Sequence, residues 1–264
     1  MTPLHAIVLG IVQGATEFLP VSSSGHLILI PRLFGWPDQG LVFDAAVHLG
    51  TVAALLIYFA TELRSLAAGI LESRPADRRL AAGVLLGSIP AGIAGLAFHH
   101  AIESQLRSVT VVAASTIVWA LVLWWADRRA ARNRAGQLRE VGIGQALVVG
   151  LAQPLALIPG TSRSGITISA GLFAGLDRAT AARFAFLLGL PVTLAAGLLE
   201  ASGLLRAGMT GDGAGVIALG VVTSFVAGLA AIRFLVGYLQ RRTLLVFVLY
   251  RIALGVLLFW LARG

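Results

Sequence analysis

Apolar residues occur along the chain in long runs that short polar segments separate. Six runs approach the ~20 residues that an α-helix needs to cross the hydrocarbon core of a bilayer. They are Val47–Ala60 with its flanks, Leu80–Phe98, Val109–Trp125, Ala182–Leu199, Ala214–Leu235 and Leu244–Leu261. The pattern predicts an all-α, polytopic integral membrane protein.

Two further apolar segments are interrupted by a proline and continue in hydroxyl residues. Gln13–His26 reads QGATEFLPVSSSGH, and Pro159–Gly165 reads PGTSRSG. Proline disrupts a helix, and serine and threonine are favoured N-caps of the next one. The apolar pieces that follow, HLILI before Pro31 and GITISAGLFAG, are too short to span a bilayer. Because non-helical backbone is tolerated at membrane depth only where protein or water satisfies it, we predict two re-entrant helical hairpins.

The two halves of the chain resemble each other at an offset of 140 residues. Gly10–Gly25 lies over Gly150–Gly165, with identities at Gly10, Gln13, Ser22, Ser24 and Gly25. Weaker matches follow in the same order: His48–Gly50 with Leu187–Gly189, and Leu85–Gly95 with Val221–Ala231. We therefore predict one membrane domain built from an internal repeat. Its parts are repeat one at about 1–126, a cytoplasmic Arg-rich loop at 127–140, and repeat two at about 141–264.

Arginine-rich loops predict the orientation, because basic residues favour the cytoplasmic side. The loops Glu72–Arg79 and Asp127–Arg139 enclose two spans, whereas Ala201–Gly213 holds one arginine and is placed outside. Counting the membrane crossings from these loops predicts that the first hairpin enters the membrane from outside and the second from the cytoplasm. That arrangement is an inverted-topology repeat, whose sites usually lie near the midplane at the repeat interface.

Composition supports a membrane protein and argues against several other classes. Of 264 residues 58% are hydrophobic and only 12% charged, against about 25% charged in soluble domains. The net charge of +8 comes from 20 arginines and no lysine. These arginines cluster in the loops, where anionic membrane lipids are sufficient partners, so we expect no nucleic acid. The absence of cysteine excludes disulfides and thiolate metal sites. We expect no removable signal peptide, since the N-terminus has no basic n-region.

Glu17 is an acidic residue inside an apolar segment, with Gln13 four positions before it on the same helical face. An ionisable residue at membrane depth is functional by default. The alternative is that Glu17 lies at an interface and only caps or solvates a helix end.

Arg163 is the matching ionisable residue of the second hairpin. Two short helices beginning at the serine-rich motifs would direct backbone N–H groups into one cavity, as phosphate-binding helix N-termini do. Arginine adds a bidentate fork for phosphate. The alternatives are an ion pair with Glu17 or contacts with backbone carbonyls, and helix capping is the commoner role of any one serine. The predicted substrate-binding residues are Gln13, Ser22, Ser24, Gly25, Thr161, Ser162, Ser164, Gly165 and Thr167.

His26 follows three serines and can act as a general acid or base near neutral pH. A serine within reach of a histidine can become an activated nucleophile, but the spacing does not select which serine. We interpret His48 as a packed helix residue and Asp44 as a cap of the next span. His99 and His100 are placed in an outer loop.

A divalent cation would suit the carboxylate of Glu17 and the amide oxygen of Gln13, because Mg²⁺ and Ca²⁺ prefer oxygen ligands. With one carboxylate, the phosphates of the substrate would have to complete the coordination shell. The residues alone do not establish metal dependence.

The two motifs resemble those of the bacterial undecaprenyl-diphosphate phosphatases associated with bacitracin resistance. That family has a (Glu/Gln)-x-x-x-Glu element running into PVSS-x-GH, and a second element PG-x-SRSG-x-T. They occur here as QGATEFLPVSSSGH and PGTSRSGIT, in that order and at comparable separation. Size, hydrophobicity and the two-half layout also match, so the resemblance covers essentially the whole chain.

The resemblance implies an enzyme that hydrolyses a C55 polyprenyl diphosphate to the monophosphate and phosphate, recycling the lipid carrier for cell-wall synthesis. Gln13 and Glu17 are then the metal- and diphosphate-associated pair, with glutamine at a position that is often acidic. Ser23 is the nucleophile and His26 transfers a proton. The implied phosphate-binding residues are Ser162, Arg163 and Thr167. The implied location is the bacterial cytoplasmic membrane, with the site opening to the outer face.

Two alternatives remain at this point. Inverted repeats with broken helices are also transporter architecture, so a lipid flippase or secondary transporter is the rival function. In the mechanism, a water activated by Glu17 or His26 is the rival to attack by Ser23. The catalytic candidates are thus Glu17, Ser23, His26 and Arg163, and the predicted partners are the polyprenyl lipid, membrane lipids and a second copy in a homodimer.

Overall fold

The computed structural model describes residues 1–105, 108–130, 137–206 and 212–262, and these contain helices and turns but no strand. The first half holds the helices α1 (Pro3–Phe18), α2 (Ser23–Phe34), α3 (Gly40–Tyr58), α4 (Ala60–Leu71), α5 (Pro75–Gln105) and α6 (Val109–Arg129). The second half holds η1 (Leu138–Glu140), α7 (Ile143–Ala152), η2 (Gln153–Leu157), α8 (Arg163–Phe173), α9 (Arg178–Arg206), α10 (Asp212–Leu239) and α11 (Leu245–Leu261). The all-α prediction is confirmed.

Four helices, α5, α6, α9 and α10, are long and apolar enough to cross a membrane. The pair α3 and α4 makes a fifth span if the 61° bend between them lies within one crossing. The sixth predicted run forms α11, whose 17 residues are at the short end of spanning length. The polytopic membrane architecture predicted from the apolar runs is therefore confirmed.

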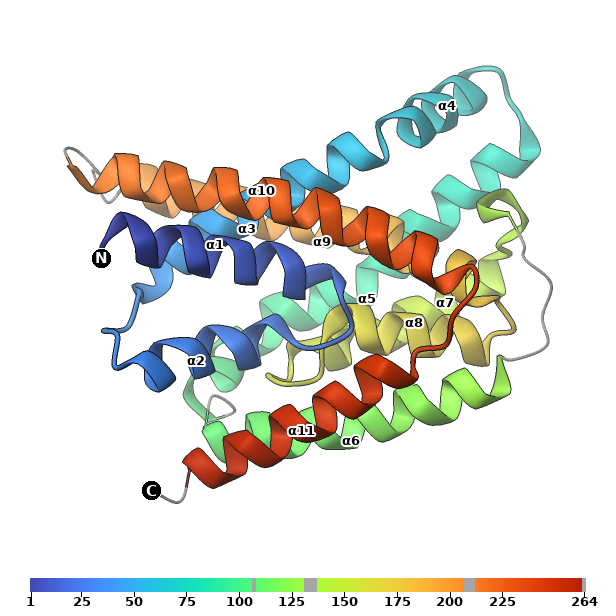
Figure 1. The fold of residues 1–264 in the computed structure, drawn as a ribbon. Coiled ribbons are helices and arrows are strands. Elements are labelled where there is room, and N and C mark those ends of the chain that lie inside the picture. The colour runs from blue at the N-terminus through green and yellow to red at the C-terminus, as the bar shows by residue number, and fades with distance from the viewer. Residues whose placement is uncertain (106–107, 131–136, 207–211, 263–264) are drawn as a thin grey trace.

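Both predicted chain breaks are present as helix–turn–helix pairs. Residues 19–22 separate α1 from α2, and residues 158–162 separate η2, which continues α7, from α8. In Figure 1 the first pair extends from the end of the molecule that carries both termini, and the second extends from the opposite end. The two breaks meet in the middle, where they place the serine-rich motifs side by side.

Two predicted boundaries are wrong. The first hairpin continues through Pro31 to Phe34, because the carbonyl of Leu27, which proline leaves without its helical donor, accepts from Gln39 Nε2 at 3.4 Å. The Arg-rich loop does not begin at Asp127, which lies inside α6. Asp127 is buried and paired with Arg178, so a charge that suggested a loop instead fixes the end of a helix. Residues 131–136 of that loop lie outside the described part of the chain.

Each hairpin packs tightly on a long helix of the other half. A Cβ on Gly14 of α1 would lie 2.3 Å from the carbonyl oxygen of Ser224 in α10. A Cβ on Gly150 of α7 would lie 2.4 Å from the carbonyl oxygen of Gly87 in α5. Backbones this close require glycine. The pairing is reciprocal between the halves, although the internal repeat itself stays a prediction.

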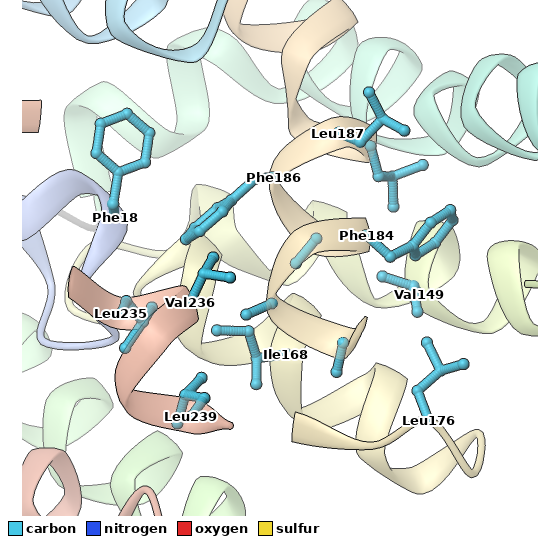
Figure 2. Close-up of a cluster of buried hydrophobic side chains, with 14 of the residues drawn as sticks. Phe18, Val149, Ile168, Leu176, Phe184, Phe186, Leu187, Leu235, Val236 and Leu239 are labelled. Atoms are coloured by element: carbon cyan, nitrogen blue, oxygen red, sulfur yellow. The ribbon is translucent and has the colours of Figure 1, made fainter. Parts of the chain in front are cut away.

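The apolar core joins the hairpins to the long helices (Figure 2). Phe18, at the end of α1, packs edge-on against Phe186 of α9 with ring centroids 5.5 Å apart. Ile168 of α8 and Leu235 of α10 lie in the same cluster. Since Phe18 follows Glu17 directly, this packing fixes the position of the carboxylate.

Candidate active site

The carboxylate of Glu17 lies at the meeting point of the two chain breaks. Its Oε1 accepts a hydrogen bond from Arg163 Nη2 at 2.8 Å. Its Oε2 accepts from Ser23 Oγ at 2.9 Å and from Gln13 Nε2 at 3.1 Å. The Glu17 side chain is only 10% exposed. Three candidate residues from α1, α2 and α8 therefore converge on one carboxylate, as the sequence predicts.

Arg163 forms an ion pair with Glu17, which the sequence analysis gave as the alternative to phosphate binding. The same guanidinium also donates to the carbonyl oxygen of Gly189, at 3.4 Å, and to the hydroxyl of Thr193 in α9. Its side chain remains 22% exposed. Arg163 thus connects both hairpins to α9 and keeps part of its surface open to a ligand.

The serines that precede α2 and α8 have matching, uncommon backbone conformations. Ser22 has φ 72° and ψ 98°, and Ser162 has φ 69° and ψ 111°. A non-glycine residue at positive φ is uncommon and costs of order 1–3 kcal/mol when strained. Such strain persists where the surroundings enforce it, and here it directs two helix N-termini to the same place.

Hydrogen bonds between the two turns hold them together. Ser24 Oγ accepts from the N–H of Gly160 at 3.2 Å, and Ser164 Oγ donates to the carbonyl of Leu19 at 3.0 Å. The two helix starts differ in capping. Ser162 Oγ accepts from the N–H of Gly165, whereas Ser22 makes no side-chain cap for α2. The N-terminus of α2 is accordingly the more open one for an anion.

Four other predicted substrate-binding residues lie against other parts of the protein itself. Thr161 is fully buried and its hydroxyl lies 3.1 Å from that of Ser115 in α6. Thr167 donates to the carbonyl of Arg163 in its own helix. Gly25 has room for a Cβ, with its nearest neighbour at 3.7 Å, and a Cβ on Gly165 would lie 2.6 Å from the guanidinium of Arg251. The role of both glycines in substrate binding stays a prediction.

His26 does not contact a serine hydroxyl, in contrast to the sequence prediction. Its Nδ1 lies 2.7 Å from the carbonyl oxygen of Ser22, and its Nε2 lies 2.5 Å from the hydroxyl of Tyr250. The hydroxyl of Ser23 is hydrogen-bonded to the carboxylate of Glu17 instead. The proton acceptor closest to this serine is therefore a carboxylate and not an imidazole.

A protein-family model described as "Bacitracin resistance protein BacA" matches residues 6–257, which include both hairpins and the whole site. The chain belongs to the BacA family. Among curated relatives, Undecaprenyl-diphosphatase of Teredinibacter turnerae is 46% identical over 264 residues, covering 98% of this chain and 99% of the relative. Undecaprenyl-diphosphatase 2 of Stutzerimonas stutzeri is 48% identical over 272 residues and covers 100% of both. The family predicted from the two motifs is confirmed.

His48 is a site residue of this BacA-family chain that the sequence interpretation missed. Its Nε2 lies 3.8 Å from Glu17 Oε2, and its side chain is 33% exposed. Its Nδ1 lies 2.7 Å from the carbonyl of Asp44, one turn earlier in α3. Asp44 is not the N-cap of this helix, which is Gln39. Two polar residues four positions apart in an apolar run were the available signal. His99 and His100 lie within α5 and not in a loop, so the prediction of an outer loop there is wrong.

Arg251 was also missed, although it is a charged residue in the middle of an apolar run. Its side chain is fully buried. It donates to the carbonyl oxygens of Thr116 at 3.2 Å, Gly160 at 3.0 Å and Thr161 at 2.8 Å, and lies 3.5 Å from that of Pro20. One arginine thus binds the backbone of both chain breaks.

The side-chain oxygens of Glu17 and Gln13 could supply part of the coordination shell of a divalent cation. Gln13 Oε1 is buried and has no hydrogen-bond partner, which is the environment expected of an oxygen that awaits a ligand. Within the described residues, no three histidine, cysteine or acidic side chains lie close enough together to hold a metal ion. Glu17 and Gln13 would therefore need phosphate oxygens of the substrate to complete the shell.

Proposed function

We propose that this BacA-family protein is a membrane phosphatase that hydrolyses undecaprenyl diphosphate to undecaprenyl phosphate and phosphate, so recycling the lipid carrier for cell-wall synthesis. The full-length relatives named undecaprenyl-diphosphatase support the substrate. The observation that carries the proposal is the hydrogen bond between Ser23 Oγ and Glu17 Oε2, with Arg163 on the other carboxylate oxygen. It places a nucleophile, its base and a phosphate-binding cation together.

In the proposed reaction the diphosphate binds at the N-terminus of α2 and at the exposed part of Arg163. Ser23 Oγ attacks the terminal phosphorus, and its proton passes to Glu17 Oε2. The bond from that phosphorus to the bridging oxygen breaks, and undecaprenyl phosphate leaves. Arg163 and the helix N–H groups stabilise the charge of the transferring phosphoryl group, the usual source of catalysis in such reactions.

Hydrolysis of the phosphoserine completes the cycle. Water attacks phosphorus and gives one proton to Nε2 of His26, the proposed proton-transfer residue. The bond from phosphorus to Ser23 Oγ breaks, Glu17 returns its proton to that oxygen, and hydrogen phosphate leaves; the imidazolium then releases its proton to solvent. Because the hydroxyl of Tyr250 donates to Nε2 in the free protein, this role requires the attacking water to take the place of that hydroxyl.

A divalent cation held by Glu17 and by Gln13 Oε1 would neutralise charge on the diphosphate. We place the protein in the bacterial cytoplasmic membrane, with the site reached from the outer face between α1 and α2. The prenyl tail lies between helices in the lipid. The largely apolar exteriors of the long helices suit such a tail, and only 28% of the most apolar window of α10 is buried inside the protein.

Phosphate release by purified protein in detergent, from undecaprenyl diphosphate with Mg²⁺ or Ca²⁺, tests the proposal. We expect release by the wild type and almost none by Ser23→Ala. No release in detergent, together with movement of the lipid across sealed vesicles, would establish the rival transport function. Acid-quenched reactions should contain phosphoserine at position 23. Full activity of Ser23→Ala would instead favour direct attack by water.

A further inference from the structure

The imidazole of His26 is held at both nitrogens. Nδ1 lies 2.7 Å from the carbonyl oxygen of Ser22, which can only accept a hydrogen bond, so Nδ1 carries the proton. Nε2 of the neutral ring is then an acceptor. It receives the hydroxyl of Tyr250 at 2.5 Å. The partners therefore select one tautomer and one ring orientation.

Tyr250 presents its hydroxyl to Nε2 from a ring that is nearly parallel to the imidazole. The planes of its ring and of the His26 ring differ by only 2°, and the ring centroids are 5.5 Å apart. The phenol oxygen lies 2.5 Å from Nε2, the nitrogen that carries the lone pair of the neutral ring. The Tyr250 residue is 46% exposed, so its hydroxyl can withdraw when a ligand arrives.

The next residue along α11 fixes the helix relative to the site. Arg251 is fully buried and donates to the carbonyl oxygens of Gly160 and Thr161, in the break before α8, and of Thr116 in α6. It also lies 3.5 Å from the carbonyl oxygen of Pro20, before α2. Because Tyr250 adjoins this anchor, its hydroxyl is placed accurately against α2. A supporting contact made by a rigid element is what preorganises a catalytic group.

We propose that Tyr250 is a positioning residue for the reaction: it holds His26 with Nε2 as a hydrogen-bond acceptor in the free enzyme and yields this position to the water that attacks the phosphoserine, which donates to Nε2. This inference rests on the proposed phosphatase function. It gives α11, which carries none of the predicted site residues, a defined part in the active site. Tyr250 does not contact the reacting atoms and acts through His26.

Tyr250→Phe tests the proposal with the loss of one oxygen atom. We expect kcat for phosphate release to fall about 10- to 100-fold, as displaced catalytic groups commonly cause, with KM changed less than about threefold. Tyr238→Phe is the matched control, because the Tyr238 ring packs against Phe247 in α10 and α11 and lies away from His26. That variant should keep both constants of the wild type. Equal thermal unfolding of the two variants in detergent would separate the effect from a loss of fold.

A second measurement does not depend on turnover. In substrate-free protein labelled with ¹⁵N-histidine, the Nε2 resonance of His26, assigned through its absence in His26→Gln, should move in Tyr250→Phe and stay in Tyr238→Phe. An unmoved resonance would show that Tyr250 does not hold His26. A moved resonance with unchanged kcat would overturn the positioning role. If the wild type releases no phosphate, the proposed function fails whatever the resonance does, and the catalytic part of this inference fails with it.

Discussion

Glu17 and Arg163 are 146 residues apart in the chain, yet Glu17 Oε1 and Arg163 Nη2 lie 2.8 Å apart. Each residue comes from a different hairpin, and their side chains are 10% and 22% exposed. A charge in such surroundings is costly unless it is paired. Each hairpin therefore supplies the counter-charge that the other one needs, and the site exists only where the two hairpins meet.

Replacing Arg163 by lysine should lower kcat/KM for phosphate release about 10²-fold or more, the usual cost of a lost transition-state donor. Lysine keeps the charge but lacks the planar fork that reaches Glu17 and Thr193 together. Arg183→Lys is the control, since Arg183 of α9 makes a similar 2.7 Å ion pair with Glu62 of α4, outside the candidate site. The assay is phosphate release in detergent. Equal losses in both variants would indicate a general effect of the substitution and contradict a specific role.

Ser23→Ala should lower kcat by at least about 10³-fold, a loss typical of a deleted nucleophile. Ser24→Ala should cost much less, because Ser24 Oγ accepts from Gly160 and does not contact Glu17. Single-turnover phosphate release measures both. Ser73→Ala, at an exposed turn between α4 and α5, serves as the neutral control. If Ser24→Ala were the more damaged variant, the nucleophile would have to be reassigned.

The sequence predicts the long helices and the chain breaks because both depend on local properties. Apolar runs such as Val109–Trp125 form helices wherever they are placed in the chain. Pro20 and Pro159 lie in the two chain breaks, where proline disfavours a continuing helix, although α2 continues through Pro31. The sequence analysis also expects the two hairpins to face one cavity, and Glu17 does meet Arg163 there. The internal repeat from which that expectation came stays a prediction.

The parts that sequence could not predict are contacts between helices with no repeat to relate them. Nothing in the pattern around Tyr250 indicates that it meets His26, 224 residues earlier. The orientation of the His26 ring depends on where α11 lies. The position of α11 depends in turn on the contacts of Arg251 with four backbone carbonyl oxygens. His48 was missed for the same reason, because its distance from Glu17 is set by the packing of α3 on α1.

His48→Leu should lower kcat about 10-fold while the fold is retained. The imidazole is a polar neighbour of Glu17 Oε2 at 3.8 Å, and leucine would put apolar surface next to a carboxylate that already has little contact with water. His5→Leu is the control, since His5 stacks on Trp36 near the N-terminus. Steady-state phosphate release measures the effect. Wild-type activity of His48→Leu would show that His48 only packs in α3.

Introduced cysteines should test the orientation, because the chain has none of its own. Asp38 and Ser73 are exposed in connections at opposite ends of the molecule. In spheroplasts, a membrane-impermeant maleimide should label Asp38→Cys. It should label Ser73→Cys only after the membrane is opened. The reverse result would place the site on the cytoplasmic side and contradict hydrolysis at the outer face.

Gly14→Ala should destabilise the protein and impair the site together. Its Cβ would lie 2.3 Å from the carbonyl oxygen of Ser224 and 2.8 Å from the backbone nitrogen of Gly228, and neither backbone atom can rotate away. α1 must therefore move off α10, at a cost of about 1–3 kcal/mol for overpacking. Glu17 lies one turn farther along α1 and would move with it.

Thermal unfolding in detergent and phosphate release measure the two effects of this substitution. A loss of about 1 kcal/mol corresponds to a Tm decrease of roughly 2–4 °C in a chain of this size. Gly95→Ala in α5 is the matched control, because a Cβ there meets nothing within 4 Å, and alanine is the better helix former. It should keep both the Tm and the activity. A Gly14→Ala protein as stable and as active as Gly95→Ala would mean that α1 does not need its close contact with α10 to place Glu17.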